Sequence, residues 1–559
     1  MVRTTVRATS ARDPRQVLAT TFLEAGELGQ GVVQVASTLL EVRAPLVDLA
    51  EDVLELAASA AGCVVEVDDR ADLVEREAQP LAAKDEPEAG PVATAVDPRR
   101  PAPLGCDEAE LLVVPDGAVG HAELLGDLAD RPGLLVLGAA CHGSRCCFTL
   151  TSTSRPDRHE RTTMFELSQD HEDFRKVVRD FAEREVEPHV AQWDRDSHFP
   201  TDLVPKMGEL GLFGLVVPEE LGGSLDPEEG GAFTSLCVAI EELGRVDQSI
   251  GITLSAGVGL GINPILSFGT DEQKQQWLPD LVAGRALAGF GLTEPDAGSD
   301  AGATRTKAVR DGDSYVVDGA KAFITNSGTD ITSVVTVTAR TGTDDKGRPE
   351  ISAIMIPSGT PGFTVEEPYH KLGWHISDTH GLSFSGARVP AGNLLGEQGS
   401  GFKQFLKTLD DGRIAISALA LGLIERMLAE STAYASSRTA FGKPIAVNQG
   451  ISFQLADLAV MAETGRVLTY KAAWLKDEHD AGRRSVADVK KAAAIAKLYT
   501  SEAAVSATRI ATQVFGGNGF MEEYPVARFY RDAKILEIGE GTSEVQRMVI
   551  ARHLGLPTA

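Results

Sequence analysis

The sequence predicts an α+β protein in which a helical domain, a β domain and a second helical domain follow one another. Apolar residues recur at helical spacing over about residues 164–284 and again over 394–556. Between them, residues 287–389 form strand-like runs separated by Gly, Asp and Pro turns. A chain of 559 residues is also too long for a single core. We therefore divide it into residues 1–163, 164–286, 287–392 and 393–559.

Residues 1–163 form an atypical N-terminal extension. They contain no Ile, Asn, Tyr or Trp and only one lysine, Lys84, although all these types are ordinary later in the chain. The missing types have AT-rich codons, so one interpretation is a start site placed too early in a GC-rich gene, with Met164 as the natural start. The stretch would then be largely unstructured. The rival interpretation is an accessory domain with helices in residues 15–60, where Val17, Leu18 and Phe22 have helical spacing, and a linker at 78–104.

Composition excludes several classes of function. A net charge of −28 argues against nucleic acid and anionic membranes as partners, because both attract basic surfaces. No run of 18 apolar residues predicts a membrane span, and the first residues lack a secretory signal. The six cysteines show neither metal-site nor disulfide spacing, so we expect reduced thiols, no metal site and a cytoplasmic protein.

The first helical domain is predicted from two amphipathic segments. In the segment that follows Asp170, the residues Phe174, Val177, Val178 and Phe181 fall on one helix face. A second helix is predicted from Asp271, with a capping start and a glycine stop at residue 284.

The β domain and the second helical domain follow from a change of period. Strands are predicted at residues 314–325, 331–340, 350–357 and 380–390. A long helical pattern then begins near residue 400 and runs to about residue 438.

Four segments carry residues suited to ligand binding. The loop at 290–303 offers hydroxyls and amides for a planar ring or a phosphate. The segment 322–328 ends a strand with Phe323 and Thr325, which can stack on and hydrogen-bond to an aromatic group. In the third segment, Arg438 can contact a phosphate. In the fourth, the glycines of residues 515–520 reduce helix stability, and that cost suggests that the backbone there approaches a ligand closely. Considered alone, the first two segments are better explained as an ordinary loop and a strand end, and the alternative for Arg438 is a solvated arginine at a helix end.

A fifth segment, residues 538–547, places Glu540 between Gly539 and Gly541, directly before a helix. Flanking glycines let backbone approach a ligand, and a carboxylate held there can act as a general base. Thr542 or Ser543 can cap the helix that follows. An ordinary capping turn explains the segment equally well when it is considered alone.

These five segments, in this order, resemble the acyl-CoA dehydrogenase family, and the resemblance covers residues 164–556. It implies an α-helical domain, a middle β-barrel domain and a C-terminal four-helix bundle. It also implies a flavoprotein oxidoreductase of fatty acid metabolism and beta-oxidation, with FAD between the β domain and the bundle. The extension at 1–163 has no counterpart in the family.

The resemblance also assigns site residues. The segments at 438–449 and 513–517 match contacts to the FAD of a neighbouring subunit, and 542–544 matches the segment at the FAD diphosphate. Arg413 is the expected polar anchor of acyl-CoA. The implied FAD contacts are Phe290, Leu292, Thr293, Gly298, Ser299, Phe323, Ile324, Thr325, Arg438, Phe441, Gln449, Gln513, Gly516, Gly517, Thr542 and Glu544. The implied substrate contacts are Ser299, Asp410, Gly412, Arg413 and Gly541.

The implied reaction is α,β-dehydrogenation of a fatty or branched acyl-CoA to a trans-2-enoyl-CoA. Glu540 would take the α-proton while a hydride passes from the β-carbon to flavin N5. The thioester enolate needs hydrogen bonds, which the resemblance assigns to the Glu540 amide and the flavin ribityl chain. The expected electron acceptor is electron-transferring flavoprotein, and the expected assembly is a homotetramer.

Other readings stay open at this point. An oxidase of the same fold would pass electrons to oxygen, a scaffold would have lost catalysis, and a carrier protein could replace CoA. Some family members place the base at the position of Gly412, beside which Asp411 is expected to face away. Gly539 stands where a tyrosine is common, which opens space near the thioester. His380 stands where arginine is common, and we expect it at the surface or in a loop.

Overall fold

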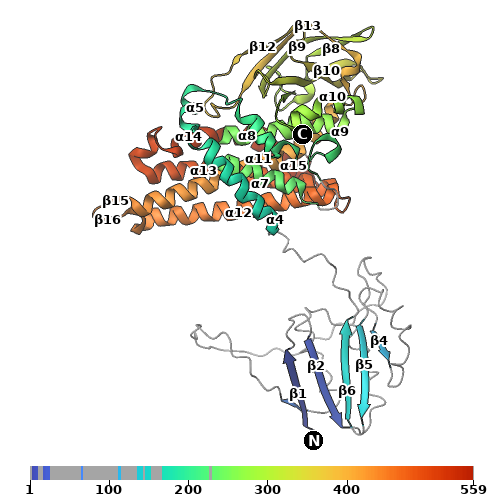
Figure 1. The fold of residues 1–559 in the computed structure, drawn as a ribbon, viewed down its shortest axis with the longest axis vertical. Coiled ribbons are helices and arrows are strands. Elements are labelled where there is room, and N and C mark those ends of the chain that lie inside the picture. Colours follow the sequence, from blue (N-terminus) through green and yellow to red (C-terminus); the bar gives the residue numbers. More distant parts are fainter. Residues whose placement is uncertain are drawn as a thin grey trace. The chain divides into compact units, whose positions relative to one another are not determined.

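The computed structural model describes residues 167–225 and 230–557, together with the backbone of six strands in the first 160 residues. The chain divides into two compact units, residues 1–160 and 161–559. Figure 1 shows the second unit as a β domain packed on a helical bundle.

The first unit contains one six-stranded sheet with the strand order β3-β1-β2-β6-β5-β4. Val17, Leu18 and Phe22, whose spacing predicted a helix, lie in strand β2, so that prediction is wrong at these positions. β-Branched residues such as Val17 and Thr20 favour strands, and here they outweigh the helical spacing. The rest of the helical prediction for residues 15–60 lies outside the described residues. The strands are β1 (Arg3–Ser10), β2 (Val17–Glu24), β3 (Val64–Glu66), β4 (Leu111–Val114), β5 (Leu135–His142) and β6 (Arg145–Ser152).

The second unit opens with a helical domain. Helix α4 begins after the capping residue Ser168 and buries Val178 and Phe181 against α7. Val177, predicted on the same face, is 48% exposed, because it lies about 100° around the helix axis from Val178. The helices are α4 (Gln169–Phe181), α5 (Val190–Asp196), α6 (Leu203–Glu209), α7 (Ala232–Val246), α8 (Gln248–Ala256), α9 (Asn263–Phe268) and α10 (Asp271–Val282).

Two of these helices bear on the sequence predictions. Thr270 and Gln273 form a reciprocal capping box at the start of α10, and Gly284 ends it at φ +67°, as predicted. Helices α8 and α9 are joined by the π-helical turn η4 (Gly257–Ile262). By length and composition, residues Gln248–Phe268 could cross a membrane, but 78% of the most apolar window is buried inside this unit. Burial of this kind is typical of a core helix.

The β domain is one eight-stranded sheet in the order β12-β13-β9-β8-β10-β11-β14, with β7 paired to β10. Four predicted strands are confirmed as β9, β10, β11 and β13, and the last strand, β14, lies just beyond residue 392. Side chains on one face form a separate apolar core that includes Tyr315, Val335 and Ile354. The strands are β7 (Leu287–Gly291), β8 (Lys307–Asp311), β9 (Ser314–Thr325), β10 (Thr332–Thr343), β11 (Pro349–Pro357), β12 (Phe363–Pro368), β13 (Thr379–Pro390) and β14 (Leu394–Leu395).

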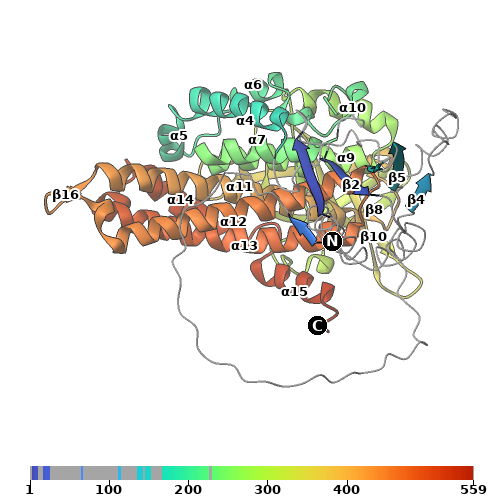
Figure 2. The same cartoon turned by 90° about the horizontal axis from the view of Figure 1, so that it is seen from below.

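The C-terminal bundle is built on three long helices that lie side by side in Figures 1 and 2. The predicted long helix is α11 (Gly401–Ser437), and its apolar faces pack on α12, α13 and α7. A hairpin of β15 (Thr439–Ala440) and β16 (Lys443–Pro444) joins α11 to α12. The other helices are α12 (Gln449–Asp480), α13 (Val486–Phe515), α14 (Pro525–Ala533) and α15 (Ser543–His553).

Candidate active site

The Glu540 segment is a strained turn between α14 and α15. Glu540 has φ +54°, in the left-handed region that non-glycine residues rarely adopt, and Gly541 follows at φ +87°. The Thr542 hydroxyl accepts a hydrogen bond from the Val545 amide at 3.3 Å, which confirms Thr542 as the cap of α15. A left-handed conformation at a glutamate has a conformational cost that the surrounding contacts must offset.

The Glu540 carboxylate lies against Gly412 of α11. A Cβ built on Gly412 would be 2.6 Å from Oε2 of Glu540, closer than real carbon–oxygen contacts allow. Glycine is thus required at residue 412 for the carboxylate to occupy this space. Oε2 is buried and has no hydrogen-bond partner within the described residues. A buried acceptor of this kind is costly unless a ligand satisfies it.

Burial sets the ionisation of Glu540. Removal from water raises the pKa of Glu540 from 4.5 to about 7, and the positive charges of Arg413 and Lys497 partly offset that rise. A carboxylate with a pKa near 7 can accept a proton far more readily than an exposed one.

The first half of α11 supplies a charged wall beside this carboxylate. Nη1 of Arg413 donates to Oδ1 of Asp410 at 2.6 Å, and Nζ of Lys490 lies 3.0 Å from Oδ2 of the same aspartate. Asp410 and Arg413 are both buried.

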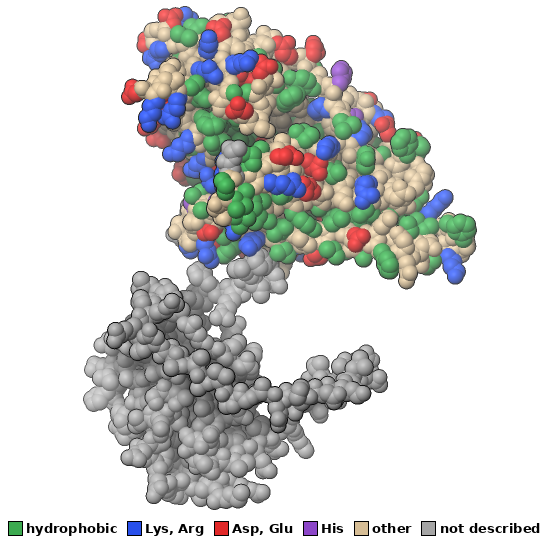
Figure 3. Space-filling model, turned by 180° about the vertical axis from the view of Figure 1, so that it is seen from behind, with side chains coloured by type: hydrophobic (Ala, Val, Ile, Leu, Met, Phe, Trp, Pro, Cys, Tyr) green, Lys and Arg blue, Asp and Glu red, His purple; other side chains and the backbone are tan. Residues whose placement is uncertain are grey.

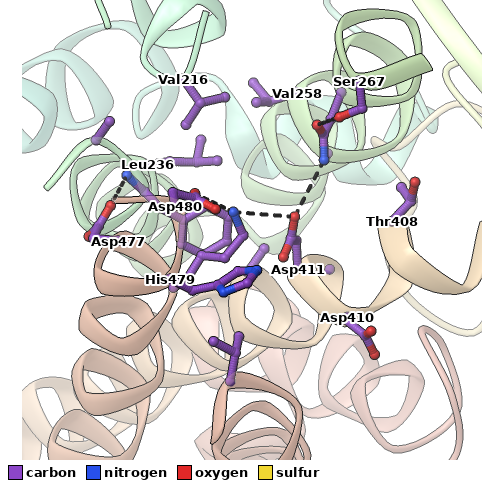
Figure 4. Close-up of a pocket in the computed structure, with 18 of the residues that line it drawn as sticks. Val216, Leu236, Val258, Ser267, Thr408, Asp410, Asp411, Asp477, His479 and Asp480 are labelled. Atoms are coloured by element: carbon purple, nitrogen blue, oxygen red, sulfur yellow. Dashed lines mark hydrogen bonds and ion pairs between the residues drawn. The ribbon is translucent and has the colours of Figure 1, made fainter. Parts of the chain in front are cut away.

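A cavity of about 350 Å³ opens between α7, α9, α11 and the ends of α12 and α13 (Figure 4). Gly412 lines it, so the cavity reaches the residue against which Glu540 lies. Asp411 points into the space between the helices. Its Oδ2 lies 3.5 Å from Nδ2 of Asn263 and 3.7 Å from Nζ of Lys476. Burial raises the pKa of Asp411 to about 6. Apolar side chains lining the cavity include Val216, Leu236, Val258, Leu266, Phe268, Ala415 and Val489.

The two predicted flavin segments of the β domain are tied together. The amide of Ala322 donates to the Thr293 carbonyl at 2.9 Å. Nζ of Lys321 is fully buried and donates to the Leu292 carbonyl at 3.3 Å and to Oε1 of Glu294 at 2.7 Å. Burial lowers the pKa of Lys321 to about 8. Burial raises the pKa of Glu294, but the ion pair and hydrogen bond with Lys321 lower it further, and the resulting pKa is about 2. Both members of the pair are therefore charged at neutral pH.

These segments expose some predicted residues and bury others. Phe323 is 64% exposed at φ +63° and packs against Tyr369, whereas Ile324 points into the β-domain core. Phe290 is also buried, stacked on Phe405 with ring centroids 3.8 Å apart. Gly298 and Ser299 are exposed, and Leu292, Thr293 and Thr325 are partly exposed.

His380 corrects a prediction, because it is buried in β13 and not in a surface loop. Its Nδ1 faces the Glu366 carbonyl at 2.6 Å and its Nε2 faces Oδ1 of Asp378 at 2.8 Å. Burial lowers the pKa of His380, but the hydrogen bonds to Asp378 and Glu366 raise it above 6.5 overall. Oδ2 of Asp378 accepts the amides of Ser327 and Gly328, so His380 supports the turn that follows β9.

The remaining predicted cofactor residues lie at the other end of the bundle. The ring of Tyr434 near the end of α11 stacks on Phe515 at the end of α13, with centroids 4.0 Å apart, which brings the two segments together. Along α11, Gly412 and Ser437 are separated by about 37 Å at 1.5 Å per residue. One copy of this chain therefore keeps this group far from Glu540, as expected if it serves a neighbouring copy. The group comprises Arg438, Phe441, Gln449, Gln513, Gly516 and Gly517.

The exposed residues in both groups fit an aromatic cofactor with phosphates. Phe323 and Phe441 are exposed aromatic rings, both at positive φ. A Cβ added to Gly298, Gly516 or Gly517 would meet nothing within 4 Å, which leaves backbone free to approach a ligand. Glu544 and Thr542 lie at the start of α15, where free amides favour anions. Within the described residues, no cluster of His, Cys, Asp and Glu fits a metal ion.

Sequence reasoning missed three buried polar residues around these segments. They are Lys321, Lys497 and Gln546, each less than 2% exposed. Lys321 directly precedes the segment 322–328, and Gln546 lies within the 538–547 segment. Lys497 is 43 residues before Glu540, so only the fold brings it to the turn.

Comparison with known proteins agrees with this architecture. Family models for the N-terminal, middle and C-terminal domains of acyl-CoA dehydrogenase match residues 168–285, 289–387 and 399–555. A probable acyl-CoA dehydrogenase of Bacillus subtilis is 49% identical over 390 residues, which are 70% of this chain and 99% of that protein.

Two solved structures are also similar. Butyryl-CoA dehydrogenase of Megasphaera elsdenii is 43% identical with a TM-score of 0.66, covering 70% of this chain and 99% of that one. A chain from a structure described as the electron transferring flavoprotein of Acidaminococcus fermentans is 41% identical with a TM-score of 0.65, again covering 70% and 99%. The chain thus belongs to the acyl-CoA dehydrogenase family of flavin-dependent oxidoreductases.

Proposed function

We propose that this chain is an FAD-dependent dehydrogenase that converts a short-chain acyl-CoA to the trans-2-enoyl-CoA, with Glu540 as the base. One observation carries the proposal. The buried, unpartnered Oε2 of Glu540 lies against Gly412, at a residue that lines a cavity leading in from the helical domain. A ligand atom that donates a proton there would satisfy an acceptor to which the described residues offer no hydrogen bond.

The residues of this chain account for the proton-transfer half of the reaction. Glu540 is pre-positioned by its left-handed turn and takes the α-proton of the thioester. Its pKa near 7 leaves a substantial carboxylate fraction at neutral pH while making that carboxylate a stronger base than an exposed one. The exposed segments of the β domain and the bundle of a neighbouring copy would hold FAD, which would supply the oxidant for the β-carbon.

A short acyl chain is supported by the charges in the cavity wall. Asp411 and Lys476 lie within 4 Å of each other, and both line the cavity. A long alkyl chain that reached them would remove water from both charges, which costs free energy. The similarity to butyryl-CoA dehydrogenase of Megasphaera elsdenii supports the same choice. Lys407 and Lys490, also in the wall, suit the phosphates of CoA.

The proposed assembly is a homotetramer that passes electrons to an electron-transferring flavoprotein in the cytoplasm. Large apolar side chains are exposed on the second unit, including Phe441 and Phe453, and hydrophobic side chains are visible on the face shown in Figure 3. Exposed apolar area of this kind is typical of subunit interfaces. The similarity to a chain in the Acidaminococcus fermentans structure supports the electron acceptor.

The test is anaerobic titration of the purified yellow protein with acyl-CoAs of four to sixteen carbons. We expect butyryl-CoA to bleach the flavin fastest, electron-transferring flavoprotein to restore its colour, and enoyl-CoA to accumulate. Bleaching that is fastest with long chains would contradict the substrate assignment, and no bleaching with any acyl-CoA would contradict the function.

Exposure of the bleached protein to air separates the remaining alternative. Slow reoxidation supports a dehydrogenase, whereas rapid reoxidation with release of peroxide would identify an oxidase. An acyl thioester of a carrier protein, compared with the matching CoA ester, decides between the two carriers.

A further inference from the structure

Lys497 of α13 is a buried cation beside the Glu540 turn. Its side chain is fully inaccessible to solvent, and its Nζ donates to the Gly541 carbonyl at 2.7 Å. Among the described residues, no carboxylate oxygen lies within 4.0 Å of the Lys497 Nζ, the distance at which an ion pair forms. A buried ammonium group without a paired carboxylate is costly, so its presence calls for an explanation.

The same carbonyl is held by a second side chain. Nε2 of Gln546 donates to the Gly541 carbonyl at 2.9 Å and to the Glu540 carbonyl at 3.3 Å. The turn is therefore fixed from α13 on one side and from α15 on the other. The Gly541 carbonyl can accept both hydrogen bonds, but the Gln546 amide shows that a neutral donor serves it as well, so the hydrogen bond alone does not require a cation at position 497.

The charges that face Glu540 differ in how far they are neutralised. Arg413 of α11 is paired with Asp410 at 2.6 Å, and that aspartate also meets Lys490. Among the residues that the structure describes, Lys497 of α13 has no carboxylate at ion-pair distance. Burial lowers the pKa of Lys497 to about 8, against the opposing influence of the negative charge of Glu540. The ammonium form therefore still predominates at neutral pH. Both positive charges lower the pKa of Glu540, Arg413 more than Lys497, but the charge of Arg413 is also shared with Asp410.

We propose that Lys497 is a positioning residue for proton transfer, whose charge keeps Glu540 ionised and whose hydrogen bond fixes the Glu540 turn. This inference rests on the proposed function. Burial alone would leave Glu540 protonated, and so unable to accept a proton, over more of the neutral pH range. A cation held next to the turn opposes that tendency without donating a hydrogen bond to Oε2, which stays free for the α-proton.

The test is the pH dependence of kcat/KM for butyryl-CoA with the flavin-loaded protein. Lys497→Met removes both charge and donor, Lys497→Gln keeps a donor without charge, and Lys497→Arg keeps the charge. Lys491→Met, at an exposed lysine of the same helix, is the matched control. Flavin content and thermal midpoint are recorded for each variant.

We expect the acid limb of the profile to move to higher pH by about one unit in the Met and Gln variants, with roughly tenfold lower kcat/KM at pH 6. The Arg and Lys491→Met variants should keep the wild-type limb. If Lys497→Met does not fold, the Gln and Arg variants decide.

Two outcomes would overturn the proposal. One is an unshifted acid limb in a folded, flavin-loaded Met or Gln variant, and the other is an equal loss at every pH. Either result would leave the proposed function intact, because the wild-type protein would still oxidise butyryl-CoA. An inactive wild-type protein would instead contradict the proposed function itself.

Discussion

The carboxylate of Glu540 occupies the space that a side chain on Gly412 would fill. Gly412 belongs to α11 and Glu540 to the turn before α15, and a Cβ on Gly412 would be 2.6 Å from Oε2 of Glu540. Gly412→Ala should therefore displace the carboxylate and lower kcat at least tenfold, while flavin binding is preserved. Gly465→Ala on α12, where a Cβ would meet only ordinary contacts at 3.5 Å, is the control and should be nearly neutral. Unchanged kcat in Gly412→Ala would show that this contact is not needed.

The same geometry allows the base to be moved from the turn before α15 to helix α11. In the double variant Gly412→Glu/Glu540→Gly, the new glutamate side chain extends from α11 into the space that the Glu540 carboxylate occupies in the wild type. We expect Glu540→Gly to be inactive and the double variant to recover measurable dehydrogenation of butyryl-CoA. Steady-state assays of the two variants make the comparison. Recovery no greater than in Glu540→Gly would argue that the approach from α11 cannot reach the α-proton.

Lys321 should control flavin retention. Its ammonium group joins Glu294 and the Leu292 carbonyl, so Lys321→Met leaves a buried carboxylate unpaired at a cost of about 3–5 kcal/mol. We expect the variant to lose most of its flavin on gel filtration. Lys307→Met, at an exposed lysine of β8, should retain it. Full flavin content in a folded Lys321→Met protein would disprove the role.

Glu540 should destabilise the fold above neutral pH. Its pKa is about 7 in the folded chain and 4.5 as the ordinary value, so folding favours the protonated form. The stability present below pH 4.5 is lost as pH rises through 7. Allowing for partial exposure of the residue, Glu540→Gln should be more stable than wild type by roughly 1–3 kcal/mol at pH 8. At pH 5 the difference should be small. Thermal midpoints at both pH values measure it, and equal differences would contradict the assigned pKa.

Much of the fold was predictable because its signals are local. The strand β9 and the capping of α10 follow from residue period and from turn residues that act over a few positions. The burial of Val177 and His380 was predicted wrongly, because it depends on which face of their helix or strand packs against a neighbouring element. For His380, the partner Glu366 comes from the adjacent strand, and its approach is fixed by sheet register.

The catalytic residue of the site could be predicted from the sequence, but the buried residues that hold it in position could not. Glu540 and Arg413 stand in segments that resemble the family, so their roles could be named from the sequence. Lys497 carries no local signal, since an isolated lysine in a helix is usually solvated. Its burial is determined by the packing of α13 on α15, which places it against the Gly541 carbonyl.

The most direct test of Glu540 as the base is the rate of flavin bleaching by butyryl-CoA in Glu540→Gln under anaerobic conditions. Glutamine keeps the size of the side chain and cannot accept the proton. We expect the variant to bind FAD fully and butyryl-CoA normally, with bleaching slower than wild type by about four orders of magnitude or more, since loss of the base removes proton transfer altogether. A rate within tenfold of wild type would show that another residue takes the α-proton.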